Sequence, residues 1–427
     1  MKCRNCKNKL DSKILNLGSQ PISSVFYKKK TTNLKKYSLD LYQCKKCELI
    51  QFKKLAPLDD MYGTTYGYRT SLSNLMINHM KAKYNKIINK NIIKKNDIII
   101  DIGSNDATFL NFFAKKEISK LSFFGIDPSA DKFKKYYNKK INLITDFFNQ
   151  NIANKLIKKF NVKNRVKLIT SFAMFYDIED PNSFCNSINT LLSKDGKWIL
   201  ELSYFPLLLK NLTYDQICHE HVTYYTLSTF KHIIEKNNLK IQDIDFNEIN
   251  GGSVEITCIK KRSELKINQE KINYYLNEER KIDKNAFINL QKRIDNTKNI
   301  LNVLLNNINK NEIIGYGAST KGNIVLNHCG ITSNQIKYIC DANNEKHGKF
   351  TPGSNIKIIS KEKMRQLKPK YLLVLIWSFR KEVILQEQDY IKKGGSLIFH
   401  LPSLHVINKF NYKNYINDNF ETFSFNF

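Results

Sequence analysis

The chain has 427 residues, of which 42% are hydrophobic and 12% aromatic, values typical of globular rather than disordered proteins. It has 69 Lys and Arg against 39 Asp and Glu, a net charge of +30, but these basic residues are spread along the whole chain and form no long arm, as in a compositionally biased protein. No apolar run approaches the ~20 residues that cross a bilayer, and the N-terminus lacks a secretory signal's apolar core. We therefore expect a cytoplasmic protein of two or three domains.

Two Cys-x-x-Cys pairs, Cys3 with Cys6 and Cys44 with Cys47, stand near the N-terminus. Each pair presents two thiolates to one ion, and together they make the closed four-cysteine set of a structural zinc site. Because all four ligand positions are filled, none is left for water or substrate. Zinc would allow residues 1–66 to fold despite a small core. The alternative is four unrelated thiols.

Short apolar runs alternate with helical stretches from about residue 91. We expect strands at residues 97–102, 121–126, 141–144, 166–170 and 196–200, with a helix over 109–114 and a turn at Asp195-Gly196. Alternation of this kind predicts a doubly wound, mostly parallel sheet.

A second α/β unit follows a long helical stretch. Residues 267–308 contain no Gly or Pro, and their apolar residues recur at three- and four-residue steps, which predicts one long helix or two. The second unit then has strands expected near residues 313–317, 336–339, 371–376 and 395–399.

Three acidic residues, Asp101, Asp127 and Asp146, end successive strands of the first unit. The turn after Asp101 has one glycine, Gly103, instead of the G-x-G-x-x-G of dinucleotide sites, and an acidic strand end suits the ammonium of S-adenosylmethionine. Asp127 could accept from the ribose hydroxyls, and Asp146 from the adenine amino group, with Phe147 against the ring. Each acid alone could instead be a helix N-cap. The predicted cofactor site also includes Asn105 and Asp106.

His219, Glu220 and His221 form a compact acid/base cluster, preceded by Cys218 and followed by Tyr224. Histidine supplies a base with a pKa near neutrality, and Glu220 supplies a carboxylate to orient it. A His-x-His metal site is one alternative, although a third ligand is not evident nearby, and an ordinary polar loop is another.

The order of these motifs resembles that of the deoxysugar C-methyltransferases, which build branched sugars for antibiotics and bacterial surface polysaccharides. The resemblance covers nearly the whole chain and rests on the following segments: the two Cys-x-x-Cys pairs, Tyr66-Gly67-Tyr68 with Ser71 and Ser73, Asp101 to Asp106, His219 to His221, Gly251-Gly252-Ser253, Gly315 to Asn323, and Asp341-x-Asn343-x-x-Lys346-x-Gly348-x-x-x-Pro352-Gly353. It implies an α/β chain in three parts: a zinc-binding module (1–66), a class I S-adenosylmethionine-dependent methyltransferase domain (67–262), and linker helices with a Rossmann-like, nucleotide-sugar-binding domain (263–427).

The implied reaction is methylation of a carbon, C3, of a nucleotide-linked 4-keto-hexose in surface-polysaccharide or branched-sugar biosynthesis. By analogy His221 removes the C3 proton, Glu220 orients it, His219 stabilises the oxyanion and Tyr68 lines the sugar site. The implied substrate contacts are Cys218, Tyr224, Lys321 near the diphosphate, Asn323 and Asp341.

Three positions depart from the relatives' pattern: Cys218 replaces a tyrosine, Asn250 a histidine and Ala107 a glycine. The first two put the sugar and the methylated carbon in doubt, and leave the reaction class intact. The main alternative is an O- or N-methyltransferase acting on a surface-glycan precursor, and a second is a zinc-containing nucleic-acid-binding protein. We expect a monomer without nucleic-acid or membrane partners.

Overall fold

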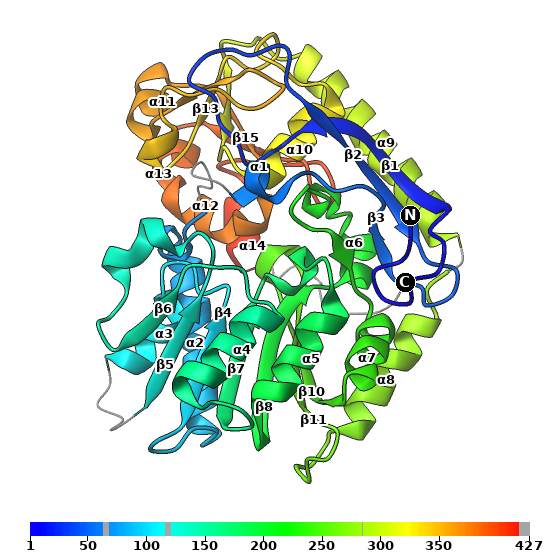
Figure 1. Cartoon of the computed structure of the whole chain (residues 1–427). Helices are drawn as coiled ribbons and strands as arrows, with labels where there is room; N and C mark the ends of the chain where they lie inside the picture. Colours follow the sequence, from blue (N-terminus) through cyan, green and yellow to red (C-terminus); the bar gives the residue numbers. More distant parts are fainter. Residues whose placement is uncertain (63–67, 116–120, 284, 418–427) are drawn as a thin grey trace.

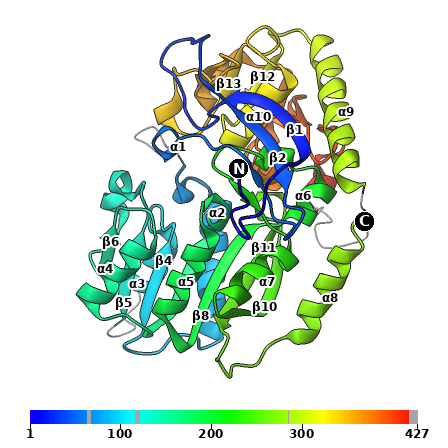
Figure 2. The same cartoon turned by 45° about the vertical axis from the view of Figure 1, so that its right-hand side comes forward.

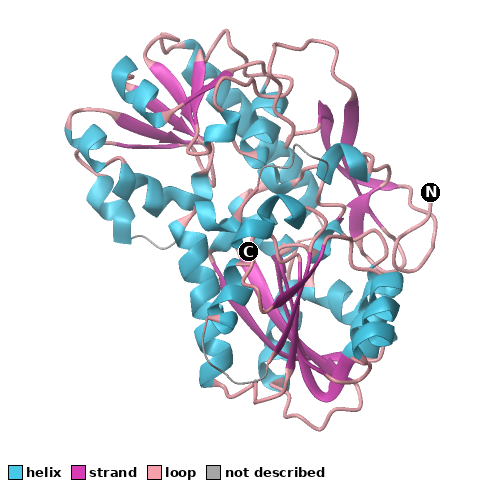
Figure 3. Cartoon of the chain, turned by 60° about the vertical axis from the view of Figure 1, so that its left-hand side comes forward, coloured by secondary structure: helices cyan, strands magenta, loops and turns pink. Residues whose placement is uncertain are grey.

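The computed structural model describes residues 1–62, 68–115, 121–283 and 285–417. The domain boundary expected at residue 66 therefore lies outside the described residues, as do Tyr66 and Gly67. The described chain contains three sheets, with strand orders β1-β2-β3-β9, β10-β11-β8-β7-β4-β5-β6 and β14-β13-β12-β15-β16-β17. They form separate groups of strands with helices around them (Figure 3). No helix in these ranges is long and apolar enough to span a bilayer.

The N-terminal sheet is antiparallel and is not made by the N-terminal segment alone. Its strands β1 (Ser12–Pro21), β2 (Lys36–Gln43) and β3 (Ile50–Phe52) are joined by β9 (Thr223–Tyr224), with Ile50 opposite Tyr224. Its buried leucines share one hydrophobic core with α9 (Ala286–Asn306), and the helix runs beside β1 and β2 (Figures 1 and 2). Two later parts of the chain therefore support the N-terminal strands.

The four predicted zinc ligands, two before β1 and two in the β2–β3 connection, meet in one cluster. Cys3 Sγ lies 3.6 Å from Cys47 Sγ, Cys6 Sγ lies 3.4 Å from Cys44 Sγ, and the four sulfurs lie within 4.8 Å of one another. Tetrahedral zinc with Zn–S bonds of about 2.3 Å would separate its sulfurs by about 3.8 Å, so the cluster fits the ion. Gln51 Nε2 also donates to Cys3 Sγ at 3.1 Å, a supporting contact typical of metal ligands.

The seven-stranded sheet has a parallel core of β4 (Ile98–Ile102), β5 (Ser122–Ile126), β6 (Ile141–Ile144), β7 (Val166–Phe172) and β8 (Leu192–Ser203). Two antiparallel strands, β10 (Leu239–Asn247) and β11 (Ser253–Lys260), extend one edge. Accompanying helices are α2 (Asn74–Asn89), α3 (Thr108–Ala114), α4 (Gln150–Phe160), α5 (Pro181–Leu191), α7 (Leu227–Lys236) and α8 (Gln269–Arg280). Both faces of the sheet are thus covered, as predicted for a doubly wound fold.

One expected turn in this sheet is wrong. Asp195 and Gly196 do not precede a strand but lie inside β8, where the pairing jumps from Val166 opposite Leu192 to Leu168 opposite Lys197. The extra residues of β8 form a bulge, and a Cβ at Gly196 would lie 2.6 Å from the Val166 carbonyl oxygen. The glycine therefore permits a close approach between strands at a bulge.

The third sheet is parallel except for its last strand. It comprises β12 (Ile313–Tyr316), β13 (Tyr338–Cys340), β14 (Lys357–Ile359), β15 (Tyr371–Val374), β16 (Ser396–Phe399) and the antiparallel β17 (His405–Ile407). Its helices are α10 (Thr320–Cys329), α11 (Lys361–Leu367), α12 (Arg380–Gln386), α13 (Gln388–Lys392) and α14 (Tyr412–Asn417). Two short helices, α1 (Leu58–Tyr62) and α6 (Phe205–Asn211), lie in the connections, and the predicted helical stretch forms two helices, α8 and α9.

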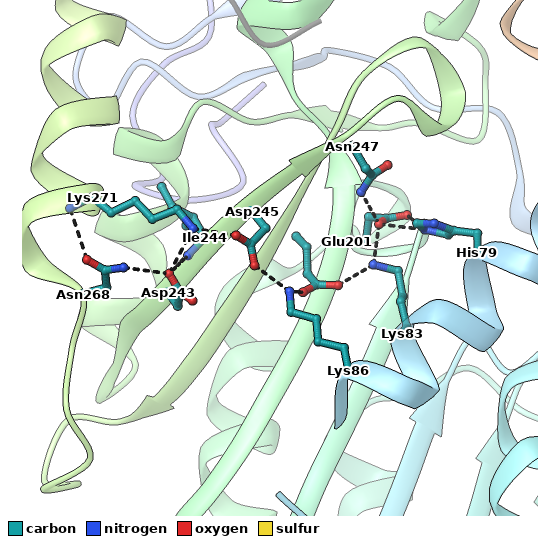
Figure 4. Close-up of polar contacts among 11 residues, drawn as sticks. His79, Lys83, Lys86, Glu201, Asp243, Ile244, Asp245, Asn247, Asn268 and Lys271 are labelled. Carbon is teal, nitrogen blue, oxygen red and sulfur yellow. Dashed lines mark hydrogen bonds and ion pairs between the residues drawn. The ribbon is translucent and has the colours of Figure 1, made fainter. Parts of the chain in front are cut away.

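A buried ion network ties α2 to the antiparallel edge of the central sheet (Figure 4). Lys83 Nζ lies 2.6 Å from Glu201 and 2.5 Å from Glu255, and Lys86 Nζ lies 2.5 Å from Glu255 and from Asp245. His79 Nε2 and Asn247 Nδ2 complete the shell of Glu201 at 3.0 and 2.6 Å. Because Glu201 and Glu255 are both buried, the Lys83 ammonium between them compensates two carboxylates that have little contact with water.

Replacing this buried ammonium should destabilise the central domain. Lys83→Met leaves Glu201 and Glu255 without their shared cation, and we expect a loss of about 3–5 kcal/mol in the free energy of unfolding, measured by urea titration with tryptophan fluorescence. Lys86→Met is the matched control, because the Lys86 side chain is 37% exposed and should cost less. An equal or smaller effect of Lys83→Met would show that the network does not hold this edge.

Loss of zinc should destabilise the segment that precedes β9. We expect one zinc per chain by elemental analysis, and its loss in Cys44→Ser, with unchanged zinc in the control Cys185→Ser, a buried thiol outside the cluster. Because β3 pairs with β9, the zinc-free variant should also show faster amide hydrogen exchange in residues 217–225. Full zinc content in Cys44→Ser, or unchanged exchange in those residues, would contradict this coupling.

Candidate active site

One cavity of about 650 Å³ lies where the carboxyl ends of strands from both parallel sheets meet. From the central sheet it is lined by Asp101 near the end of β4, Gly103 after it, Asp127 after β5 and Glu201 in β8. From the C-terminal sheet it is lined by Tyr316 and Gly317 at the end of β12, Asp341 after β13 and Ile376 after β15. We call this space the central cavity. Both sheets thus direct their ligand-binding edges into the same volume.

The β4–α3 turn is built for a ligand at close range. Gly103 has φ +79°, and a Cβ there would lie 2.9 Å from Met174 Cγ, so a larger residue would be strained. Its N–H donates to the Ile126 carbonyl at 2.8 Å, and Asn105 N donates to Asp127 Oδ2 at 2.9 Å. Ala107 adopts φ +59°, a conformation that favours glycine.

Asp101 and Asp127 both face the cavity with little contact with bulk water. Thr170 Oγ1 donates to Asp101 Oδ1 at 2.6 Å, yet burial raises the pKa of Asp101 to about 7. Burial also raises the pKa of Asp127, although Ser129 N donates to its Oδ1 at 2.7 Å. Buried carboxyl groups whose pKa is raised in this way favour a ligand that carries a positive charge or donates hydrogen bonds to them.

Asn105 and Asp106 hold the segment that carries Tyr68. Asn105 Oδ1 accepts from Thr70 N at 2.9 Å, its Nδ2 donates to the Tyr68 carbonyl at 3.2 Å, and Asp106 Oδ2 accepts from Ser71 N at 3.0 Å. Asn105 and Tyr68 line the central cavity, and Tyr68 is 50% exposed. Asp106 does not line the cavity, because its carboxylate serves this segment and the start of α3.

The structure separates Asp146 from the other predicted cofactor residues. Asp146 is exposed, accepts a hydrogen bond from the backbone N–H of Phe147 at 2.7 Å, and does not line the cavity. Phe147 does line it, together with Phe148 and Asn149. The strand-end pattern located this loop, but it could not tell which of its side chains turn inwards.

The histidine cluster is divided between two sides of the loop before β9. His221 lines the cavity with its ring centroid 4.1 Å from that of Tyr176, and Cys218 and Glu220 line it too. His219 is buried outside the cavity, edge-on to Tyr37 of β2 at 6.1 Å. Tyr224 is also outside it, donating to the Gln216 carbonyl at 3.4 Å. Among residues placed by the structure, the four cysteines alone form a metal-sized ligand group, so the His-x-His metal alternative gains no support.

His221 is a neutral imidazole at pH 7. Burial, with a smaller effect from the positive charge of Lys321, lowers its pKa to about 3. The sequence suggested that Glu220 orients this ring, but the structure shows no direct hydrogen bond between Glu220 and His221. The Glu220 side chain is 6% exposed, and neither carboxylate oxygen has a hydrogen-bond partner among the described residues. A buried carboxylate in this state favours a ligand that donates hydrogen bonds to it.

The C-terminal sheet brings two of its three predicted residues to the cavity. Asp341 and Lys321 line it, whereas Asn323 is buried outside it and donates to the Ser23 carbonyl at 2.7 Å. The Lys321 Nζ donates to Asn250 Oδ1 at 2.9 Å, in the β10–β11 connection of the central domain.

Several residues that line the central cavity were not predicted from the sequence. Ser24 and Phe26, from the β1–β2 connection, carried no chemical signal at all. Lys361 follows β14, a strand too short to show periodicity. Glu201 is an acidic residue within the apolar run of β8, and this pattern was the one signal that could have identified it. Lys346 was part of a quoted motif, and its Nζ donates to the Ala318 carbonyl at 2.8 Å.

Three family models match the chain in succession. They are described as "Putative zinc binding domain" over residues 3–62, "Methyltransferase domain" over 76–244 and "C-methyltransferase C-terminal domain" over 248–402. The C-methyltransferase NovU of Streptomyces niveus is 25% identical over 376 residues, which cover 87% of this chain and 88% of NovU.

Solved structures resemble the chain over less than half of its length. A protein of Pyrococcus horikoshii OT3 is 14% identical and covers 45% of this chain and 95% of its own, with a TM-score of 0.36. An S-adenosylmethionine-dependent methyltransferase of Aquifex aeolicus is 13% identical and covers 43% of this chain and 97% of its own, with a TM-score of 0.30.

The three matched domains follow one another in the order of the three sheets, and the four clustered cysteines lie in the first of them. The chain therefore belongs to the S-adenosylmethionine-dependent C-methyltransferases that combine a zinc-binding domain, a methyltransferase domain and a C-methyltransferase C-terminal domain.

Proposed function

We propose that the protein transfers a methyl group to C3 of a nucleotide-linked 4-keto-hexose. The observation that carries this proposal is the central cavity, which joins the strand ends of two α/β sheets and holds a neutral histidine at its wall. A cavity of this kind can take a cofactor on one sheet and a nucleotide on the other, with the reacting carbon between them. The name of the relative NovU supports carbon as the methyl acceptor.

The cofactor end of the cavity is the central sheet. We assign Asp101 to the ammonium of the amino-acid moiety, Asp127 to the ribose hydroxyls and Phe147 to the adenine ring, with Gly103 and Asn105 shaping the turn between them. Buried carboxyls and a turn without a Cβ fit this ligand. Bound there, S-adenosylmethionine supplies a methyl group on a sulfonium leaving group.

The nucleotide end is the C-terminal sheet. The Gly317 turn leads into α10, whose first backbone N–H groups offer an anion-binding end, and Lys346 and Lys361 line the same region. Asp341 follows β13 at the position where an acid in related folds accepts from ribose hydroxyls. A nucleoside diphosphate suits this combination of lysines, helix terminus and strand-end acid.

His221 is the proposed base. Its imidazole is neutral, so it can accept the C3 proton, which the neighbouring ketone makes acidic. Burial raises the pKa of Cys218 well above its ordinary value, so this thiol stays protonated and does not compete for the methyl group. Glu220, with two free acceptor oxygens, is placed to bind a sugar hydroxyl. Tyr68 lines the remaining wall.

Incubation with methyl-labelled S-adenosylmethionine and a panel of nucleotide 4-keto-6-deoxyhexoses should give one product that gains one methyl group. The same member should take up solvent deuterium at C3 when the cofactor is absent, because deprotonation precedes methylation. His221→Asn should lower both rates by at least about 100-fold, while binding of S-adenosylhomocysteine stays within about twofold. Mass spectrometry and NMR measure these quantities.

The competing reaction classes give different results in this experiment. Methylation of the 4-hydroxy analogue, obtained by reduction of the ketone, would show oxygen rather than carbon as the acceptor and would contradict the proposal. Absence of C3 exchange in a sugar that is nevertheless methylated would contradict base-assisted enolisation. Methylation of oligonucleotides would show that the substrate is a nucleic acid and would contradict the proposal.

The pKa of Asp101 predicts how cofactor binding depends on pH. Because this pKa is raised to about 7, the carboxyl becomes neutral as the pH falls below that value, and only the carboxylate pairs with the ligand ammonium. Calorimetry with S-adenosylhomocysteine should show affinity falling between pH 7.5 and 5.5, approaching tenfold per pH unit.

The Asp101→Asn variant should bind weakly with a flat pH profile. Asp195→Asn is the matched control, since Asp195 is an exposed carboxylate outside the cavity, and it should retain the wild-type profile. Wild-type affinity independent of pH, or an unchanged profile in Asp101→Asn, would remove Asp101 from the cofactor site.

A further inference from the structure

Lys321 lies at the boundary between the two ligand-binding sheets. It is the second residue of α10, where Ser319 Oγ accepts from Gly322 N at 2.9 Å and fixes the start of the helix. Its side chain lines the central cavity, and its Nζ donates to Asn250 Oδ1 at 2.9 Å. A lysine of the C-terminal domain thus reaches a residue of the methyltransferase domain, across the cavity that we assign to the two ligands.

The groups around Lys321 are those of the proposed chemistry. Burial lowers the pKa of His221, and the positive charge of Lys321 lowers it further. Burial raises the pKa of Asp215 and of Cys218, and the Lys321 charge opposes both rises. Burial lowers the pKa of Lys321, and the negative charge of Asp215 opposes this and favours the ammonium. The buried Asp215 carboxylate accepts from Trp377 Nε1 at 2.8 Å, and its second oxygen has no hydrogen-bond partner among the described residues. Lys361 and Lys346, in contrast, bond to groups of the C-terminal domain.

The reaction needs a positive charge next to the base. When a C3 proton leaves, negative charge develops on the oxygen of the adjacent C4, so the group that stabilises this oxygen must lie near His221. His219, which the sequence suggested for this role, is buried against Tyr37 outside the cavity. Lys321 has three N–H donors, of which Asn250 uses one. A charge that acts mainly on the developing oxyanion accelerates the chemical step rather than substrate binding.

We propose that Lys321 is a further catalytic residue, whose ammonium binds the C4 oxygen of the sugar and stabilises the enolate. This inference rests on the proposed function. The C3 proton passes to the His221 imidazole, and the C3–H electron pair forms the C3–C4 double bond as the carbonyl π pair moves to oxygen. Lys321 stays protonated throughout. C3 then bonds to the methyl carbon, the C4 carbonyl re-forms, and S-adenosylhomocysteine leaves with the S–CH3 electron pair.

Solvent-deuterium exchange at C3, without cofactor and at saturating sugar, tests this role. The probe is the 4-keto-6-deoxyhexose nucleotide that the wild type turns over. Lys321→Met should lower the saturating exchange rate by about 10²–10³-fold, and Lys321→Arg, which keeps the charge, should lose less. Unchanged calorimetric binding of S-adenosylhomocysteine shows that both variants fold. Lys361→Met is the matched comparison, a cavity lysine bonded to Gln386, and should raise KM more than it lowers the rate.

The outcomes separate this inference from the function on which it rests. If the wild type exchanges and methylates but Lys321→Met keeps the saturating rate and only raises KM, Lys321 is a binding residue and the inference is overturned. The same holds if Lys321→Arg loses as much as Lys321→Met, since a stabilising charge would be retained in the arginine. A wild type that neither exchanges nor methylates any probe would instead overturn the proposed function, and this inference with it.

Discussion

The structure depends on one geometric constraint: the carboxyl ends of the parallel strands of two sheets face a single cavity. Parallel strands bind ligands at this edge, because the loops and helix N-termini that follow them converge there. A fold with one such sheet can hold one nucleotide-like ligand in this way. Two sheets that share the cavity can hold a cofactor and a second nucleotide at once, with their reactive ends close together, and the rest of the chain serves to keep the two edges opposed.

Long-range contacts maintain that opposition. β3 of the zinc-binding domain pairs with β9, which begins two residues after His221, and α9 packs its apolar side on the same N-terminal strands. Lys321 of the C-terminal domain bonds to Asn250 of the central domain. Lys83 of α2 pairs with Glu201 of β8 (Figure 4), and Glu201 is one of the residues that line the cavity. The zinc site therefore supports the loop of the proposed base, although it lies outside the cavity itself.

Local sequence patterns predicted most of the α/β strands, because buried parallel strands are short apolar runs between turns. The same patterns could not show that Thr223–Tyr224 completes the N-terminal sheet, since that pairing joins residues far apart in the chain. At the site, Asp101, Asp127 and His221 reach the cavity, whereas Asp146 and His219 do not. Asp146 and His219 lie in loops, where no regular periodicity in the sequence tells which side chains point into the cavity. Ser24, Phe26 and the position of Lys321 beside Asn250 follow from tertiary packing alone.

The most direct test of this account is a crystal structure of the protein with S-adenosylhomocysteine and a nucleoside diphosphate bound together. We expect the adenosine ribose at Asp127, the diphosphate near Lys346 and Lys361, and an open space between the two ligands that is bordered by His221 and Lys321. A nucleotide bound outside the central cavity, or one that competes with S-adenosylhomocysteine for the central sheet, would contradict the division of one cavity between two sheets.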